Sequence, residues 1–226
     1  MAEQRVTRVL CAADPGGAID ALLEVAAGAD VQALALVGEL GGGATLKALA
    51  RSGLTAFWVP GPGDAPIASY LRESANLEVV APALHGVHGT AAFADSHTVF
   101  AGFGGEVSDD PGAERDEIDS LRYPRWEPEY RLKILRELDE HELVLLFSTP
   151  PAHHSLSDGA GSDVLAELVG TYRPRLVVCG GRRGSEMIGR SPVVAPGRAG
   201  DGHYAIADVH SREVTLEEMP AGSRAS

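Results

Sequence analysis

The stretch Val9-Leu10-Cys11-Ala12-Ala13-Asp14-Pro15-Gly16-Gly17-Ala18-Ile19-Asp20-Ala21-Leu22 decides the fold class. It begins as an apolar run that predicts a buried strand, turns at Pro-Gly-Gly, and continues with the apolar spacing of a helix. Asp14 is therefore expected at the carboxyl end of a strand. In open α/β sheets ligands bind at that edge, because loops and helix amino termini meet there. Asp14 is thus the first candidate for a ligand site.

The same unit, a strand followed by a glycine-rich loop with one acid and then a helix, repeats through the first 80 residues. Such alternation predicts a largely parallel sheet with helices packed on it. The loop acids are Asp14, Glu39 and Asp64, which we expect to converge on one edge of the sheet. The expected strands cover 5–11, 31–37, 56–59 and 77–80, and the expected helices cover 17–28, 44–52 and 65–74.

The rest of the chain continues the α/β pattern without a linker. A loop carrying His85 and His88 comes first, and the acidic segment 106–120 has the composition of a solvated loop. We predict one domain over residues 1–216 and a polar tail over 217–226. Further strands are expected at 98–101, 143–147 and 176–179, helices at 127–140 and 161–171, and an antiparallel meander at 193–195, 203–208 and 213–216.

Composition and charge exclude several classes of partner. The 226 residues are 44% hydrophobic, enough for one sizeable core. The formal net charge of −13 argues against nucleic acid or an anionic membrane as partner. No apolar run approaches the roughly 20 residues that span a bilayer, and the first residues do not resemble a signal peptide, so we expect a cytoplasmic protein. Cys11 and Cys179 end apolar strands and are expected to be buried free thiols rather than zinc ligands.

The order of the loops resembles that of the calcineurin-like metallophosphoesterases. Members of that family carry Asp-x-His, Gly-Asp, Gly-Asn-His-Asp/Glu, an isolated His and Gly-His-x-His, each at a strand end. The resemblance spans about residues 6–209, ends with Pro196-Gly197-Arg198 and the strand that follows, and implies a two-sheet α/β sandwich with flanking helices. The corresponding loops here are Asp14-Pro15-Gly16, Gly38-Glu39, Gly61-Pro62-Gly63-Asp64, Ser148-Thr149-Pro150-Pro151 and Gly180-Gly181-Arg182-Arg183.

The family's chemistry uses two divalent metals about 3.5–4 Å apart, which activate a water and clamp the phosphate. Asp14 is retained at its ligand position, and Glu39 replaces the bridging Asp. Glycine offers no ligating atom, and a guanidinium repels a cation. The resemblance therefore implies a family member whose dinuclear site has degenerated, with no metal or other cofactor expected. At the positions where the family has a metal-binding His or Asn, this chain has Gly16, Pro62, Ser148, Gly181 and Arg183. Gly63 stands where the family has the His that assists the leaving group.

A rebuilt single-metal site remains an alternative. It would hold Mn, Mg or Fe with Asp14, Glu39 and Asp64, together with one histidine from His153, His154, His85 and His88. The simpler account of these histidines is that they lie on the surface.

A hydrolytic triad is a second alternative. Ser148, His153 or His154, and Asp158 have the right residue types, but no nucleophile-elbow pattern surrounds Ser148. A triad is defined by geometry, so sequence proximity alone does not establish one.

The loop Gly180-Gly181-Arg182-Arg183 is the most informative departure from the family. Without metals, Asp14 and Glu39 would face each other uncompensated, and unpaired buried charge is costly. One hypothesis is that Arg183 fills the former metal cavity as an internal ion pair. The other is that Arg182 or Arg183, with the amides of Gly180 and Gly181, forms a metal-free anion site for a phosphate or nucleotide.

The sequence therefore predicts a non-catalytic protein that binds a small phosphorylated ligand or a protein partner. An active phosphoesterase with a rebuilt metal site is the alternative from another class. A structural homo-oligomer without a ligand is the third.

Overall fold

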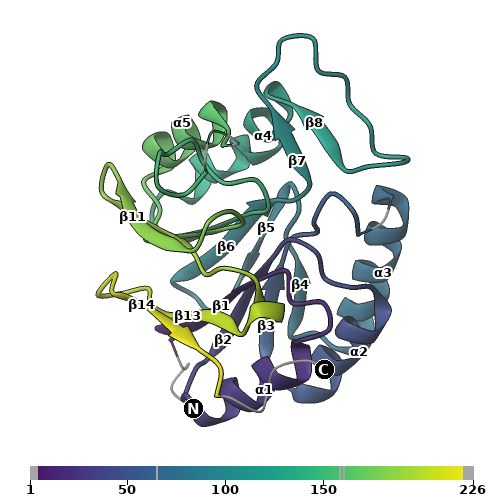
Figure 1. Cartoon of the computed structure of the whole chain (residues 1–226), viewed down its shortest axis with the longest axis vertical. Coiled ribbons are helices and arrows are strands. Elements are labelled where there is room, and N and C mark those ends of the chain that lie inside the picture. The colour runs from purple at the N-terminus through teal and green to yellow at the C-terminus, as the bar shows by residue number, and fades with distance from the viewer. Residues whose placement is uncertain (1–4, 65, 158, 160, 221–226) are drawn as a thin grey trace.

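The computed structural model describes residues 5–64, 66–157, 159 and 161–220 (Figure 1). The helices are α1 (Ile19–Gly28), α2 (Gly43–Ser52), α3 (Ile67–Val80), α4 (Trp126–Arg131), α5 (Asp163–Tyr172) and the 3₁₀ helices η1 (Leu132–Leu138) and η2 (Ala199–Asp201). The strands are β1 (Arg8–Ala13), β2 (Ala33–Val37), β3 (Thr55–Trp58), β4 (Leu84–Gly86), β5 (Thr90–Phe93), β6 (Thr98–Phe103), β7 (Glu106–Ser108), β8 (Arg122–Pro124), β9 (Glu142–Phe147), β10 (Leu176–Cys179), β11 (Gly184–Ile188), β12 (Ser191–Ala195), β13 (His203–Asp208) and β14 (Val214–Glu218).

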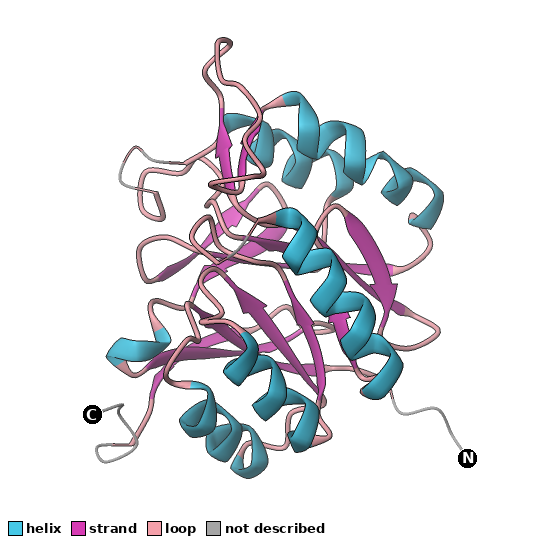
Figure 2. Ribbon diagram, turned by 90° about the vertical axis from the view of Figure 1, so that its right-hand side faces the viewer, coloured by secondary structure: helices cyan, strands magenta, loops and turns pink. Residues whose placement is uncertain are grey.

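The strands form two six-stranded sheets. The first has the order β14-β13-β1-β2-β3-β4, and the second has the order β11-β12-β10-β9-β6-β5. Strands β7 and β8 pair separately. The helices lie outside the strands, as Figure 2 shows. This arrangement confirms the two-sheet α/β sandwich with flanking helices.

Burial on both faces explains why β1 is apolar throughout. Because successive side chains alternate across a strand, Val9 and Cys11 enter the core shared by the two sheets, whereas Leu10 and Ala12 join the core beneath α1 to α3. A third core packs η1 and α5 against the outer face of the second sheet. The opening strand therefore supports two of the three apolar layers.

The two cysteines are buried free thiols, as predicted. Cys11 lies between the sheets, and Cys179 lies between the second sheet and its helices. Burial raises the pKa of both thiols, that of Cys179 to about 12, so neither is a reactive thiolate at neutral pH.

The strand predicted over 77–80 is wrong. Helix α3 continues to Val80, and the next strand, β4, lies within the segment predicted to be a loop. The Val79 and Val80 side chains are exposed on the helix surface. A four-residue segment with three apolar residues does not distinguish a strand from the end of a helix.

The predicted closing meander is wrong in part, since only its last two strands pair with each other. Strand β12 lies parallel to β10 in the second sheet, whereas β13 and β14 form an antiparallel pair in the first. The chain crosses between the sheets through η2. The polar tail begins later than predicted, because β14 includes Glu217 and Glu218 and Met219 is buried. Residues 221–226 lie outside the described part.

The helix predicted over residues 127–140 does not keep one regular winding along its length. Tyr130 and Ile134 are exposed, whereas Leu132 and Leu135 are buried. The helix changes from α to 3₁₀ at Leu132, and the tighter winding shifts which residues face the sheet.

The acidic segment is tied to the body of the protein. The Arg131 guanidinium binds the Glu117 carboxylate at 2.9 Å and the Glu127 carboxylate at 2.6 Å. The segment is therefore not simply a solvated loop.

No helix in the described ranges has the length and apolar character needed to cross a membrane.

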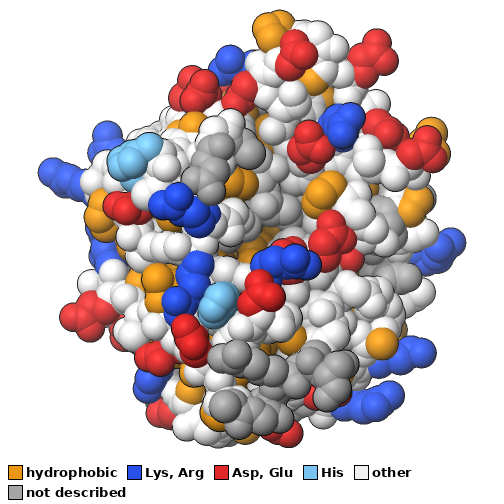
Figure 3. All heavy atoms as spheres, in the orientation of Figure 1, with side chains coloured by type: hydrophobic (Ala, Val, Ile, Leu, Met, Phe, Trp, Pro, Cys, Tyr) orange, Lys and Arg blue, Asp and Glu red, His pale blue; other side chains and the backbone are white. Residues whose placement is uncertain are grey.

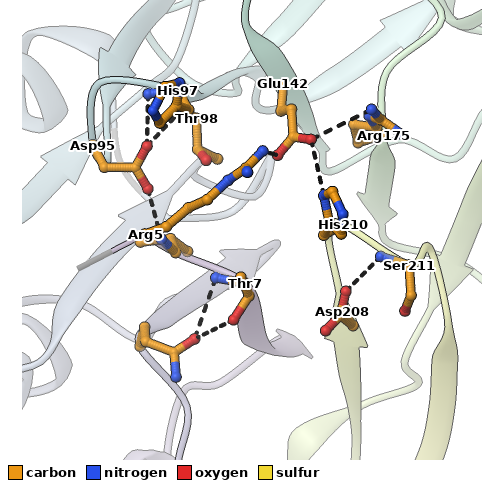
Figure 4. Close-up of polar contacts among 12 residues, drawn as sticks. Arg5, Thr7, Asp95, His97, Thr98, Glu142, Arg175, Asp208, His210 and Ser211 are labelled. Carbon is orange, nitrogen blue, oxygen red and sulfur yellow. Dashed lines mark hydrogen bonds and ion pairs between the residues drawn. The ribbon is translucent and has the colours of Figure 1, made fainter. Parts of the chain in front are cut away.

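The basal edge, where β9 and β10 begin, is fastened by the Glu142 carboxylate (Figure 4). It lies 2.7 Å from the Arg5 guanidinium, 3.4 Å from that of Arg175, and 3.4 Å from the His210 ring. Arg5 precedes β1 and His210 follows β13, so these contacts join the first sheet to the second.

Asp95 makes a second set of contacts at this edge. Its carboxylate accepts the backbone N–H groups of Val6, His97 and Thr98. Burial favours the neutral acid, but these hydrogen bonds outweigh it and hold the pKa of Asp95 below its usual value.

We expect Glu142→Gln to lower the free energy of unfolding by about 1–2 kcal/mol, because three basic groups lose their shared counter-charge in a partly solvated setting. Urea denaturation at neutral pH measures the loss. Glu137→Gln, at an exposed position on η1, is the matched control and should change stability by less than about 0.5 kcal/mol. Equal stabilities for the two variants would contradict this role.

Candidate functional site

Asp14 directly follows β1 and adopts a left-handed backbone conformation, with φ of 48°. Its Oδ1 accepts the Glu39 backbone N–H at 2.9 Å. A Cβ atom at Gly38 would lie 2.3 Å from that oxygen, so only glycine fits there. The Asp14 carboxylate thus packs directly against the loop that follows β2.

Glu39 and Asp64 complete the predicted convergence of acids. Asp64 accepts the backbone N–H groups of Leu40, Gly41 and Gly61. Glu39 Oε1 accepts the Gly63 N–H at 2.8 Å. Each carboxylate therefore binds backbone amides that surround it. We call the loops that carry Asp14, Glu39, Asp64, Ser148 and Gly180–Arg183 the acid edge.

The pKa values of Glu39 and Asp64 are raised. Burial is the largest cause for both, and the neighbouring carboxylates add to it, while the backbone hydrogen bonds act in the opposite direction. The folded protein therefore holds two carboxylates in an environment that disfavours their charge.

Two positions that carry ligand histidines in the resembling family are crowded by backbone. A Cβ at Gly16 would lie 3.0 Å from the Gly41 Cα. Gly181 has φ of 112°, and its Cβ would lie 2.5 Å from the Leu156 carbonyl oxygen. A side chain at Gly16 would need the Gly41 backbone to give way by a few tenths of an ångström, and at Gly181 both the positive φ and the Leu156 carbonyl oppose one.

Ser148 occupies a third such position and has a structural role. Its hydroxyl donates to the Pro60 carbonyl at 2.6 Å and accepts the Gly38 N–H at 3.3 Å, which joins loops of the two sheets. No histidine binds Ser148 in the described ranges, so the geometry does not support a triad there. Asp158 lies outside the described residues.

His153 and His154 lie near strand β11, and not among the carboxylates of the acid edge. The His153 and His154 rings are 4.4 Å apart. His153 Nδ1 lies 2.9 Å from the Ser155 hydroxyl, which donates to Glu186. Among the described residues, no three His, Cys, Asp or Glu side chains are grouped to hold a metal. The donor set does not fit a dinuclear centre.

The ion pair predicted between Arg183 and the acids is wrong. Arg183 donates to the Glu217 carbonyl at 3.2 Å and pairs with Glu218 at 3.7 Å, because β14 runs alongside its loop. Arg198 Nε instead lies 3.7 Å from Asp14 Oδ2. Arg182 is exposed, and its backbone N–H donates to Leu156.

Sequence reasoning missed Arg198, although it belongs to the Pro196-Gly197-Arg198 turn that resembles the family's closing turn. The backbones of Arg198 and Ala13 bridge, which places the guanidinium beside the end of β1. A Cβ at Gly197 would lie within 3.1 Å of both Arg183 and His203, so all three basic side chains adjoin this turn. Figure 3 shows basic, histidine and acidic side chains side by side at the centre of the face that Figure 1 presents.

A hollow of about 450 Å³ adjoins the acid edge. It is lined by the loops that follow β3, β6 and β9, including Pro62, Ser148 and Thr149. Ser148 connects it to Gly38 and so to the Asp14 carboxylate.

We expect Glu39→Gln to raise the melting temperature at pH 7. The folded-state pKa is raised, so above it the wild-type carboxylate is charged in both states but disfavoured only in the folded one. The gain should shrink as pH falls through the folded-state pKa of Glu39. It should vanish below the unfolded-state pKa, where the carboxyl is protonated in both states. Calorimetry across pH tests this, with the exposed Glu24→Gln as control; a pH-independent gain, or a loss at pH 7, would contradict it.

Comparisons with solved structures place the fold. The protein TT1561 of Thermus thermophilus is 36% identical, with a TM-score of 0.87 over 95% of this chain and 100% of that one. An archaeal phosphodiesterase is 11% identical, with a TM-score of 0.51 over 93% of this chain and 99% of the other, which indicates a shared fold. No curated protein matches the chain.

The model of the family described as "Metallophosphoesterase, calcineurin superfamily" matches residues 42–219. This match covers most of the chain and includes the loops of Asp64, Ser148, Arg183 and Arg198. Together with the two-sheet sandwich, it establishes what the order of loops suggested. The chain belongs to the metallophosphoesterases of the calcineurin superfamily.

Proposed function

We propose that this protein binds a small phosphorylated ligand at the acid edge through arginine side chains and does not hydrolyse it. One observation carries the proposal: the backbone crowds two ligand positions, at Gly16 and Gly181, while a guanidinium stands 3.7 Å from the retained Asp14. The fold keeps the family's ligand-binding edge, but the charge available there for a phosphate comes from arginine.

Arg198 is suited to such a role. Its side chain is 73% exposed and bound only loosely by Asp14, so it is free to turn toward an incoming anion. A guanidinium forms paired hydrogen bonds with phosphate oxygens, and a phosphate dianion would compete effectively with one carboxylate. Arg183 and His203 adjoin the same turn and would add donors.

The acids do not preclude an anion at this edge. Asp64 is bound by three backbone N–H groups and Glu39 by one, so their oxygens are directed into the loops. The hollow beside Ser148 offers space for the rest of a nucleotide-sized ligand. The buried thiols are consistent with a reducing compartment, and we propose a cytoplasmic location.

We expect inorganic phosphate or AMP to raise the melting temperature of the wild-type protein, because a ligand that binds only the folded state stabilises it. Arg198→Ala should weaken AMP binding roughly 10- to 100-fold, as expected for the loss of a charge-assisted hydrogen bond worth about 1.5–3 kcal/mol. Isothermal titration measures the affinity.

Arg51→Ala, on the exposed last turn of α2, removes the same charge elsewhere and should bind AMP like the wild type. Arg198→Ala with unchanged affinity would overturn the arginine site. Binding of neither anion would favour a scaffold or partner-binding role. Hydrolysis of a phosphodiester with added Mn²⁺, lost in Asp14→Asn, would favour a rebuilt metal site instead.

A further inference from the structure

A second hollow lies at the basal edge, on the side of the sandwich opposite the acid edge. It has a volume of about 590 Å³ and is bounded by the end of η1, the loop leading into β9, the end of α5 and the β13–β14 turn. Arg173, which ends α5, also lines an adjoining hollow of about 300 Å³ beside β12. We call the two together the Arg173 groove.

Arginines are concentrated in this groove. Five of the chain's 19 Lys and Arg residues line it, in a protein with a net charge of −13. No hydrogen bond or ion pair engages the guanidinium of Arg136 or Arg173 within the described part of the chain. The five are Arg136, Arg173, Arg175, Arg190 and Arg212.

The acids of the groove do not neutralise these two arginines. Glu142 is already shared by Arg5, Arg175 and His210, as Figure 4 shows. Asp139 and Glu140 are exposed, and among the described residues no ion pair joins them to an arginine of the groove. Across both hollows five arginines stand against three acids, Asp139, Glu140 and Glu142, so the groove keeps an excess of positive charge.

Three residues that line the groove each carry a buried polar atom without a hydrogen bond to a described residue. They are His141 Nδ1 and Arg212 Nε beside the larger hollow and the Ser191 hydroxyl beside the smaller one. These atoms lie behind the groove surface, so the exposed guanidinium groups of Arg136 and Arg173 are the donors available to a ligand.

We propose that the Arg173 groove binds a small, multiply charged oxyanion. The exposed Arg136 and Arg173 would supply guanidinium forks, and the exposed Arg190 would add a third guanidinium at the smaller hollow. Two hollows that share Arg173 suit a ligand with two anionic groups. This site lies where β9 and β10 begin, so it is separate from the acid edge and independent of the function proposed there.

The test uses the full chain with Arg198→Ala as background, which weakens anion binding at the acid edge. Inorganic pyrophosphate and citrate are titrated separately by calorimetry, which distinguishes a phosphate ligand from a carboxylate ligand. We expect at least one to bind with one-to-one stoichiometry. Adding Arg136→Ala and Arg173→Ala should weaken that binding at least 30-fold.

The matched control adds Lys47→Ala and Arg51→Ala, two exposed positions on α2, and should keep the affinity within twofold. Circular dichroism checks that each variant is folded, and Arg136→Glu alone provides a second variant with an expected loss of at least 10-fold. Absence of binding for both anions would overturn the proposal. So would equal affinities in the groove variant and the α2 control.

Discussion

The hydrogen bond from the Glu39 backbone N–H to the Asp14 carboxylate, made across the bare Cα of Gly38, is the contact on which the acid edge depends. It holds the loop after β2 against the end of β1. Asp64 and Glu39 extend the same principle, since each binds amides that lie within or next to its own loop. The three acids thus tie neighbouring loops together through backbone hydrogen bonds, with three N–H groups on Asp64 and one each on Asp14 and Glu39.

Much of this arrangement is predictable from the sequence. Asp14, Glu39 and Asp64 converge as expected because parallel strands end at one edge. The apolar runs predict buried parallel strands, and the two-sheet sandwich is what the resemblance of the loop order implied. The site's basic partner was harder to predict. Arg183 precedes β11 and is drawn to β14, a pairing that depends on which sheet each closing strand joins, and strand spacing does not determine that. Arg198 reaches Asp14 only because its turn bridges the end of β1.

The other departures have local physical causes. The apolar end of α3 resembles a strand, because periodicity is ambiguous over four residues. The change to 3₁₀ winding at Leu132 exposes Tyr130 and Ile134. The sequence shows that Gly16 and Gly181 carry no metal-ligating side chain. It does not show that neighbouring backbone crowds these positions, because the approach of Gly41 to Gly16 depends on how two loops pack together.

The account rests on the claim that the acid edge is no longer a metal centre. Equilibrium dialysis of the purified full chain against Mn²⁺, followed by metal analysis of wild type and Asp14→Asn, tests this most directly. We predict the same substoichiometric Mn²⁺ content for both proteins. One or two Mn²⁺ ions per wild-type chain, lost in Asp14→Asn, would contradict it.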